Sequence, residues 1–140
     1  MHHMNRQRII LGIDPGLAHT GWGVVSQQGN RLACVAYGCI ETCASQQLPE
    51  RLNKIYGQIS AVVARYKPSC VSIETVWFGT NTTSAFATGQ ARGAALAACA
   101  PAVDRFSEYS PKQIKLAIVG TGSADKAQVE YMVHHLLNLE

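Results

Sequence analysis

The stretch RIILGIDPGLAHTGWGVV, at residues 8–25, decides the fold. An apolar run leads into Asp14, a Pro-Gly pair follows it, and a second apolar run closes the stretch. The segment VSIETVW at residues 71–77 shows the same pattern, because its short apolar run ends at the carboxylate Glu74. Short apolar runs bounded by turn residues predict strands. Two carboxylates at the ends of hydrophobic strands are costly to bury without a positive partner, so a divalent metal ion between them is the natural candidate.

The bulk composition is that of one globular domain over residues 1–140. Hydrophobic residues make up 47% of the chain and charged residues 15%, which excludes general disorder. The net charge of +3 permits a nucleic-acid partner without requiring one. No apolar run reaches the roughly 18 residues of a membrane span, so we expect no membrane partner. The opening MHHMNRQR lacks the apolar core of a signal peptide, and we expect residues 1–7 to be disordered or tag-derived.

Cysteine usage indicates a reducing compartment. The number of cysteines is odd and no C-x-x-C motif occurs, which favours buried reduced thiols over a zinc site or disulfides. We therefore expect a cytoplasmic protein. The cysteines are Cys34, Cys39, Cys43, Cys70 and Cys99.

Hydrophobic periodicity predicts the element order βββαβαβαα. The predicted strands occupy residues 9–14, 21–27, 31–42, 70–74 and 103–108. The predicted helices occupy residues 48–66, 84–100 and 110–119 and a last stretch that Ser123 caps. Ser110 is the expected N-cap of the third helix, and Gly89 and Gly93 are expected to let the second helix approach the sheet closely. The last helix is expected to turn five residues inward, namely Val129, Met132, Val133, Leu136 and Leu137.

The connections between these elements predict an α/β fold with a five-stranded mixed sheet. The first three strands follow one another closely and should form an antiparallel meander. A long helix then separates strand 31–42 from strand 70–74, and such a crossover makes the new strand parallel to one already in the sheet. If that neighbour is strand 9–14, Asp14 and Glu74 emerge side by side at an edge where α/β sheets bind ligands.

Asp14 also has a purely structural interpretation. Asp-Pro-Gly is a strong turn former, in which the aspartate accepts hydrogen bonds from the backbone and proline and glycine take the central positions. Glu74 alone is equally ambiguous, because a carboxylate often marks the point where a strand reaches solvent. Both readings stay open at the level of the sequence.

Four segments make the chain resemble a known family. They are GIDPG with the following TGWGVV, then SIETVW, GQARG at residues 89–93, and KQIKLAIVGTGSADKAQVEYMV at residues 112–133. Together they are similar to the RuvC family of Holliday-junction resolvases, within the RNase H-like superfamily, over nearly the whole chain. The resemblance implies an RNase H-like domain with helices on both faces of the sheet.

The resemblance also implies a Mg²⁺-dependent endonuclease, with Mn²⁺ able to substitute, that acts as a homodimer on four-way junction DNA. In the family, four carboxylates bind two metal ions, and a branch-migration helicase complex is the expected partner. Asp14 and Glu74 match two of the four as catalytic and metal-binding residues. The other two belong to a further C-terminal helix that residues 1–140 do not contain. We therefore expect this chain to bind Mg²⁺ weakly and to cleave poorly or not at all.

The resemblance further implies a set of DNA-binding residues. Lysines at the positions of Lys115 and Lys126 contact phosphate near the scissile bond, and Lys112 flanks the same GTGSAD loop. An aromatic residue at the position of Trp77 stacks on a base near the crossover, which is worth about 1–3 kcal/mol per base. Arg92 either reaches phosphate or holds a helix contact. Without the resemblance, the lysines read as solvated helix residues.

Two other functions remain open. GIDPGLAHTGWG alone fits the phosphate-binding turn of an actin-like ATPase or sugar kinase, although such enzymes need two domains of this kind. A non-catalytic module that binds junctions without cutting them is the second alternative, because two metal-binding carboxylates are absent.

Overall fold

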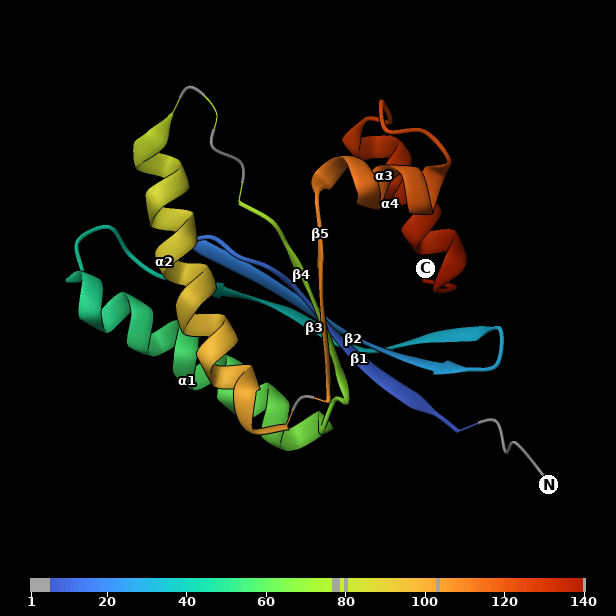
Figure 1. Ribbon diagram of the computed structural model, residues 1–140, viewed down its shortest axis with the longest axis horizontal. Helices are drawn as coiled ribbons and strands as arrows, with labels where there is room; N and C mark the ends of the chain where they lie inside the picture. The colour runs from blue at the N-terminus through green and yellow to red at the C-terminus, as the bar shows by residue number, and fades with distance from the viewer. Residues whose placement is uncertain (1–5, 77–78, 80, 103, 140) are drawn as a thin grey trace.

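A five-stranded sheet forms the centre of the protein (Figure 1). The structure, a computed structural model, describes residues 6–76, 79, 81–102 and 104–139. The strands lie in the order β3-β2-β1-β4-β5, which places β1 at the middle of the sheet. Their bounds are β1 Arg8–Asp14, β2 His19–Gln28, β3 Arg31–Glu41, β4 Cys70–Glu74 and β5 Arg105–Tyr109.

The sheet is mixed, as the sequence predicts. β1 pairs antiparallel with β2, and β2 pairs antiparallel with β3, which gives the expected meander. β4 lies parallel to β1 on one side and to β5 on the other. Gly29 has a positive φ of 60° in the two-residue turn between β2 and β3, a conformation that glycine adopts without strain.

Helices cover both faces of this sheet, and Figure 1 shows how unequally they do so. α1 and α2 lie together on one face, whereas α3 and α4 form a pair on the opposite side, next to the end of β5. The helices are α1 Leu48–Tyr66, α2 Thr82–Cys99, the short 3₁₀ helix η1 Ala100–Ala102, α3 Pro111–Val119 and α4 Lys126–Leu136.

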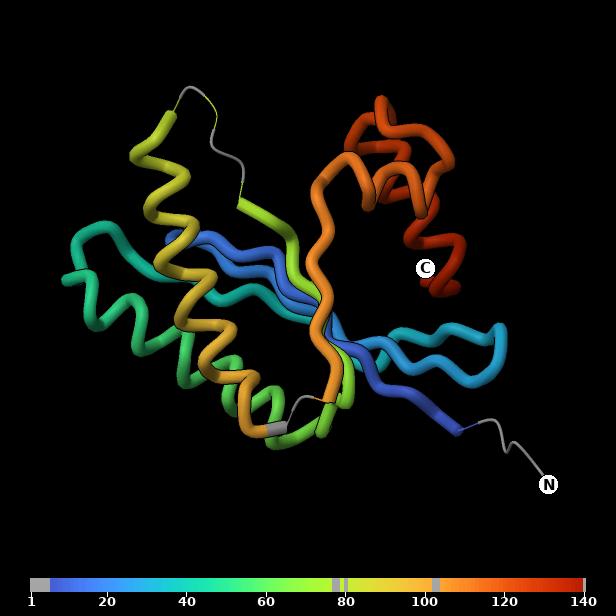
Figure 2. Tube along the Cα trace, viewed as in Figure 1, coloured from blue at the N-terminus to red at the C-terminus, as the bar shows by residue number. Residues whose placement is uncertain are grey.

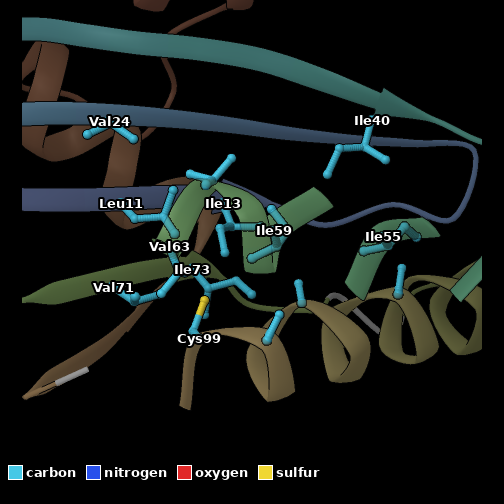
Figure 3. Close-up of a cluster of buried hydrophobic side chains, with 14 residues drawn as sticks. Leu11, Ile13, Val24, Ile40, Ile55, Ile59, Val63, Val71, Ile73 and Cys99 are labelled. Atoms are coloured by element: carbon cyan, nitrogen blue, oxygen red, sulfur yellow. The ribbon is translucent and has the colours of Figure 1, made fainter. Parts of the chain in front are cut away.

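The core lies between the sheet and the α1–α2 layer (Figure 3). α1 begins with proline in its first turn and ends at Tyr66, where the capping residue Lys67 takes a left-handed conformation before Pro68, so its bounds match the prediction. Ile55, Ile59 and Val63 of α1 pack against strand residues that point to the same face. The strand residues are Leu11, Ile13, Val24, Ile40, Val71 and Ile73.

The second helix approaches the core through alanines rather than through the glycines that the sequence suggested. Ala91, Ala95 and Ala98 are buried, whereas Gly89 and Gly93 are exposed on the other side of α2. The expectation that these glycines let α2 approach the sheet is therefore wrong, because the face that carries them points away from the sheet.

Two further expectations are wrong in detail. Asp125, not Ser123, caps α4, because its carboxylate accepts a hydrogen bond from the Gln128 amide at 2.8 Å. The Ser123 hydroxyl instead pairs with the Thr121 hydroxyl at 2.9 Å within the preceding turn. Leu136 is exposed rather than inward.

The cysteines are also less buried than expected. Cys99 is buried, Cys34 and Cys70 are half-buried, and Cys39 and Cys43 are exposed, although all of them are free. The expectation for residues 1–7 concerns mostly residues 1–5, which lie outside the described part of the chain.

One close approach inside the sheet yields a test. A Cβ atom added at Gly38 would lie 2.8–2.9 Å from the indole ring of Trp22 on the neighbouring strand. We expect Gly38→Ala to lower the free energy of unfolding by about 1–3 kcal/mol, because the ring must shift out of its contact with the core. Gly23→Ala is the control, since a Cβ there meets no atom within 4 Å. Urea unfolding measures both, and equal losses in the two variants would contradict the packing argument.

Candidate active site

The parallel pairing of β1 and β4 brings Asp14 and Glu74 together. Ile13 and Ile73 are partners in the register, so the next residue of each strand emerges at the same edge of the sheet. The two carboxyl groups lie close enough for a protonated Glu74 to donate to Asp14 and for the two to repel when both are ionised. The structure thus places the two sequence-predicted carboxylates beside one another, as the strand pattern suggested.

Burial and the neighbouring carboxylate dominate the electrostatics of Glu74. Partial burial, followed by the hydrogen bond to Asp14 and the negative charge of Asp14, raises the pKa of Glu74 to about 7. Lys115 opposes the shift, which places its ammonium group close enough to act on Glu74. A carboxyl group that holds its proton near neutral pH beside a second carboxylate is a site where a divalent cation would displace the proton.

The carboxylates of Asp14 and Glu74 could bind one cation and would fill part of its coordination shell. Mg²⁺ binds oxygen ligands and commonly combines one or two carboxylates with water and substrate phosphate. Within the described ranges, no group of three or more His, Cys, Asp or Glu side chains could hold a metal ion. The two carboxylates therefore supply part of a single site, and the described residues do not supply the set for two ions.

Two hollows meet at this carboxylate pair. One is a cleft of about 400 Å³ between the strand ends and the first turns of α2, lined on the helix side by Asn81, Ser84 and Thr88. The other, of about 420 Å³, lies over the sheet face that α1 and α2 leave open, and Gly12 and Ile114 are among its lining residues. Asp14 and Glu74 line both hollows, so a chain-like ligand could pass from one to the other across them.

The elements around the pair explain why it is accessible. β4 and β5 stay paired up to Glu74 and Tyr109, and Figure 2 shows α2 on one side of these carboxyl ends and α3 on the other. The edge of the sheet beyond Glu74 therefore faces the space between these two helices.

The predicted basic residues lie on the α3–α4 side of this edge. Lys115 is half-buried on α3, and Lys112 is exposed one turn before it, with its aliphatic chain against Gly122. Lys126 begins α4 and is exposed. Proximity to Glu74 supports Lys115 most directly, and contact of these lysines with DNA stays a prediction.

Arg92 and Trp77 need separate treatment. The Arg92 guanidinium forms an ion pair with the Glu108 carboxylate, which ties α2 to β5. Of the two roles that the sequence left open for Arg92, the structure shows the helix contact. Arg92 would have to release Glu108 in order to bind phosphate. Trp77 lies outside the described residues, so its proposed stacking on a base stays a prediction.

Sequence reasoning missed the residues that fix the turn after Asp14. The Thr20 hydroxyl donates to the Gly16 carbonyl at 2.6 Å and accepts from the Gly16 amide at 3.3 Å. The Thr42 hydroxyl donates to the Leu17 carbonyl at 2.5 Å. Among the hydrogen bonds of the described residues, none joins the Asp14 carboxylate to this turn, so the turn is held without it. A threonine at a core-facing strand position was the available signal at residue 20.

Comparison with known proteins identifies the fold and the family. The family model for the crossover junction endodeoxyribonuclease RuvC matches residues 10–140. A RuvC from Citrifermentans bemidjiense is 49% identical over 131 residues, which cover 94% of this chain and 80% of the relative. A RuvC from Rubrobacter xylanophilus is 46% identical over 133 residues, covering 95% of this chain and 74% of the relative.

Solved structures agree with this assignment. The Thermus thermophilus RuvC in complex with a Holliday junction substrate superposes with a TM-score of 0.87 at 32% identity, covering 95% of this chain and 81% of that one. The yeast mitochondrial Holliday junction resolvase Ydc2 has a TM-score of 0.66 at 10% identity, which shows the fold alone. The fold that carries this site is thus the RNase H-like nuclease fold. The chain is a member of the RuvC family of crossover junction endodeoxyribonucleases.

The carboxylate pair predicts a specific pH dependence of stability without metal. Because the pKa of Glu74 rises from 4.5 to about 7 on folding, the folded state binds more protons than the unfolded state between these values. The contribution of this group to the free energy of unfolding therefore falls as pH rises from about 4.5 to about 7. We expect Glu74→Gln to be more stable than the parent protein at pH 8 in EDTA, and the difference to vanish near pH 4.

Thermal melts at several pH values measure this effect. Glu130→Gln, on the exposed face of α4, is the control and should show no such pH-dependent gain. A Glu74→Gln variant that is equally destabilised at pH 4 and pH 8 would show that folding does not raise the pKa of Glu74.

Proposed function

We propose that this protein cuts four-way DNA junctions in a divalent-metal-dependent reaction, with Asp14 and Glu74 as metal-binding carboxylates of its active site. The observation that carries the proposal is their position side by side at the carboxyl ends of two parallel strands, in the fold of the RuvC family. Their mutual repulsion is relieved when a cation binds between them. This supports a metal role over the turn role of Asp14, since threonines hold the turn.

Mg²⁺ is the proposed ion, with Mn²⁺ as a substitute. When bound, such an ion would polarise a phosphodiester and lower the pKa of a bound water molecule. Asp14 and Glu74 would hold it, and the remaining ligands would be water and substrate phosphate oxygens. A site with two ions per active centre, as the resemblance implies, requires carboxylates in addition to those that the structure describes. The chain covers 80% of the Citrifermentans relative and 74% of the Rubrobacter one.

The proposed DNA path crosses the carboxylate pair. The polar cleft beside α2 and the open sheet face beside α3 meet there, so a single strand laid across both would present a phosphate to Asp14 and Glu74. Lys112, Lys115 and Lys126 stand on the α3–α4 side and would contact the backbone of the same strand. Trp77 is proposed to stack on a base next to the crossover.

Symmetric nicking of a junction requires two active sites, so we propose a homodimer. The outer face of α2 supports this proposal. Phe86 is 68% exposed there, and small residues at helical spacing continue the same face. They are Gly89, Gly93, Ala97 and Ala100.

The remaining context is also proposed. A branch-migration helicase complex is the expected partner, by resemblance to the family. The cytoplasm is the expected compartment, and the free state of all five cysteines supports it. None of the helices, within the residues that the structure describes, is long and apolar enough to cross a membrane.

One observation favours a second candidate function. The described residues offer two carboxylates at the site and no larger acidic cluster. A protein with this half site would bind junctions through its basic surface and leave them uncut.

Two assays on the same preparation separate these candidates. A gel shift with four-way junction DNA in EDTA measures binding, and incubation of the same DNA with Mg²⁺ or Mn²⁺ measures cleavage. Paired nicks in opposing strands establish the nuclease. Tight binding without nicks, in both metals, establishes the binding module. Absence of junction binding in EDTA would overturn both candidates.

The role of Asp14 can be tested by Asp14→Asn. We expect this variant to lose divalent-metal binding and any cleavage, and to bind junction DNA at least as tightly as the parent, because it removes a negative charge without touching a lysine. Mn²⁺ titration followed by electron paramagnetic resonance measures the metal, and the gel shift in EDTA measures the DNA. A parallel loss of folding and junction binding would restore the turn interpretation of Asp14.

Lys115 provides a test of the DNA path. We expect Lys115→Ala to reduce the slope of the logarithm of junction affinity against the logarithm of salt concentration by about one, as for the loss of one phosphate contact. Lys54→Ala is the matched control, because Lys54 lies on α1, on the opposite face of the sheet, and donates to the Glu41 carbonyl. An unchanged slope for Lys115→Ala, or an equal change for Lys54→Ala, would contradict the proposed path.

A further inference from the structure

The turn after Asp14 has a conformation with little freedom. Asp14 ends β1, and His19 begins β2, so four residues reverse the chain. A Cβ atom at Gly16 would overlap the His19 carbonyl, which excludes any side chain at that position. The fully buried Thr20 hydroxyl closes the turn from within by its two hydrogen bonds to Gly16.

A second set of hydrogen bonds holds the same turn from outside. Thr42 follows the last residue of β3, and both its amide and its hydroxyl donate to the turn. The amide reaches the Ala18 carbonyl at 3.0 Å and the hydroxyl reaches the Leu17 carbonyl at 2.5 Å. The end of β3 is therefore fastened to the turn, although the two lie 25 residues apart in the sequence.

Arg51 orients the Thr42 hydroxyl. Its Nε atom, on the first turn of α1, donates to the Thr42 Oγ1 atom at 2.8 Å. A hydroxyl has one hydrogen to donate. Since Oγ1 accepts from Arg51, that hydrogen is available for the Leu17 carbonyl, and the chain of donors runs from Arg51 through Thr42 to Leu17. A hydrogen bond with a charged donor is stronger than a neutral one.

These hydrogen bonds matter for the site because Asp14 directly precedes the 15–18 turn. Its carboxylate lies against that of Glu74, and the two repel when both are ionised. A loose turn would let Asp14 swing away and relieve the repulsion. The bonds from Thr42 and Arg51 resist that movement and keep both oxygen donors at one place before any cation arrives.

We propose that Thr42 and Arg51 are positioning residues for the metal site, which they serve by holding the 15–18 turn so that Asp14 stays beside Glu74. This inference rests on the proposed metal role of that pair. Neither residue lines the hollows at the site, and neither touches Asp14 in the described structure. They act through the backbone of the turn.

The test compares Thr42→Val, which keeps the side-chain shape and removes the hydroxyl, with Thr42→Ser, which keeps the hydroxyl. We expect Thr42→Val to weaken Mn²⁺ binding about tenfold, as does the loss of other groups that support metal ligands, and Thr42→Ser to restore it. Arg51→Lys should weaken binding in the same direction, because it removes Nε–H while keeping the charge. Arg65→Lys is its control, since Arg65 lies on the same helix and stacks on Tyr66.

Mn²⁺ titrations followed by electron paramagnetic resonance are run at a temperature where melts show every variant to be fully folded. Hydrogen exchange of the amides of residues 16–18 is recorded on the same samples. Faster exchange together with weaker Mn²⁺ binding in Thr42→Val supports the inference. Unchanged Mn²⁺ affinity in Thr42→Val overturns it, whether or not exchange is faster.

Asp14→Asn separates this inference from the proposed function. If Asp14→Asn loses Mn²⁺ binding and Thr42→Val does not, the metal site stands and the positioning role fails. If the parent protein binds Mn²⁺ no better than Asp14→Asn, the metal role of the pair fails, and the positioning role fails with it.

Discussion

Two carboxyl groups are held together at the edge of this sheet by the parallel register of β1 and β4. The ladder pairs Ile13 with Ile73, and both side chains are buried in the same core. A slip of this register by one residue would turn every side chain of β4 to the other face and separate the carboxylates. The core between the sheet and α1 thus supplies the free energy that opposes the repulsion of Asp14 and Glu74.

The unequal cover of the sheet follows from how its two faces are filled. On one face, large side chains of the strands meet α1 and the small alanines of α2, which lets two helices fit side by side. On the other face, Gly12, Gly21 and Gly23 leave a shallow surface, and α3 and α4 stand to one side of it without a buried residue in either helix. Rigid support on one face and an accessible surface on the other suit a site for a large, charged ligand.

The hydrogen bonds of the turn show a division of roles between neighbouring polar residues. In many Asp-Pro-Gly turns the aspartate itself satisfies the backbone. Here the hydroxyls of Thr20 and Thr42 do so, with Arg51 behind Thr42, and the aspartate is left to face Glu74. Arg92 likewise has a structural partner, because its ion pair with Glu108 joins α2 to β5.

The sequence by itself determined the elements and the candidate carboxylates. Helical spacing predicts α1 to the residue, Ser110 is the cap of α3 as expected, and the apolar runs place Asp14 and Glu74 side by side at one edge of the sheet. These features depend on local backbone preferences and on the period of burial, which a sequence displays directly. The cap of α4 was misassigned because Ser123 and Asp125 are both good caps, and the choice depends on the turn between them.

Only the tertiary structure decided what lies beside what. The raised pKa of Glu74, the bonds from Thr42 and Arg51 to the turn, the pairing of Arg92 with Glu108 and the burial of alanines instead of glycines on α2 all join residues on different elements. Such contacts depend on strand register, on helix rotation and on the loss of water around each group. These quantities are set by the packing of the whole chain and have no local signature in the sequence.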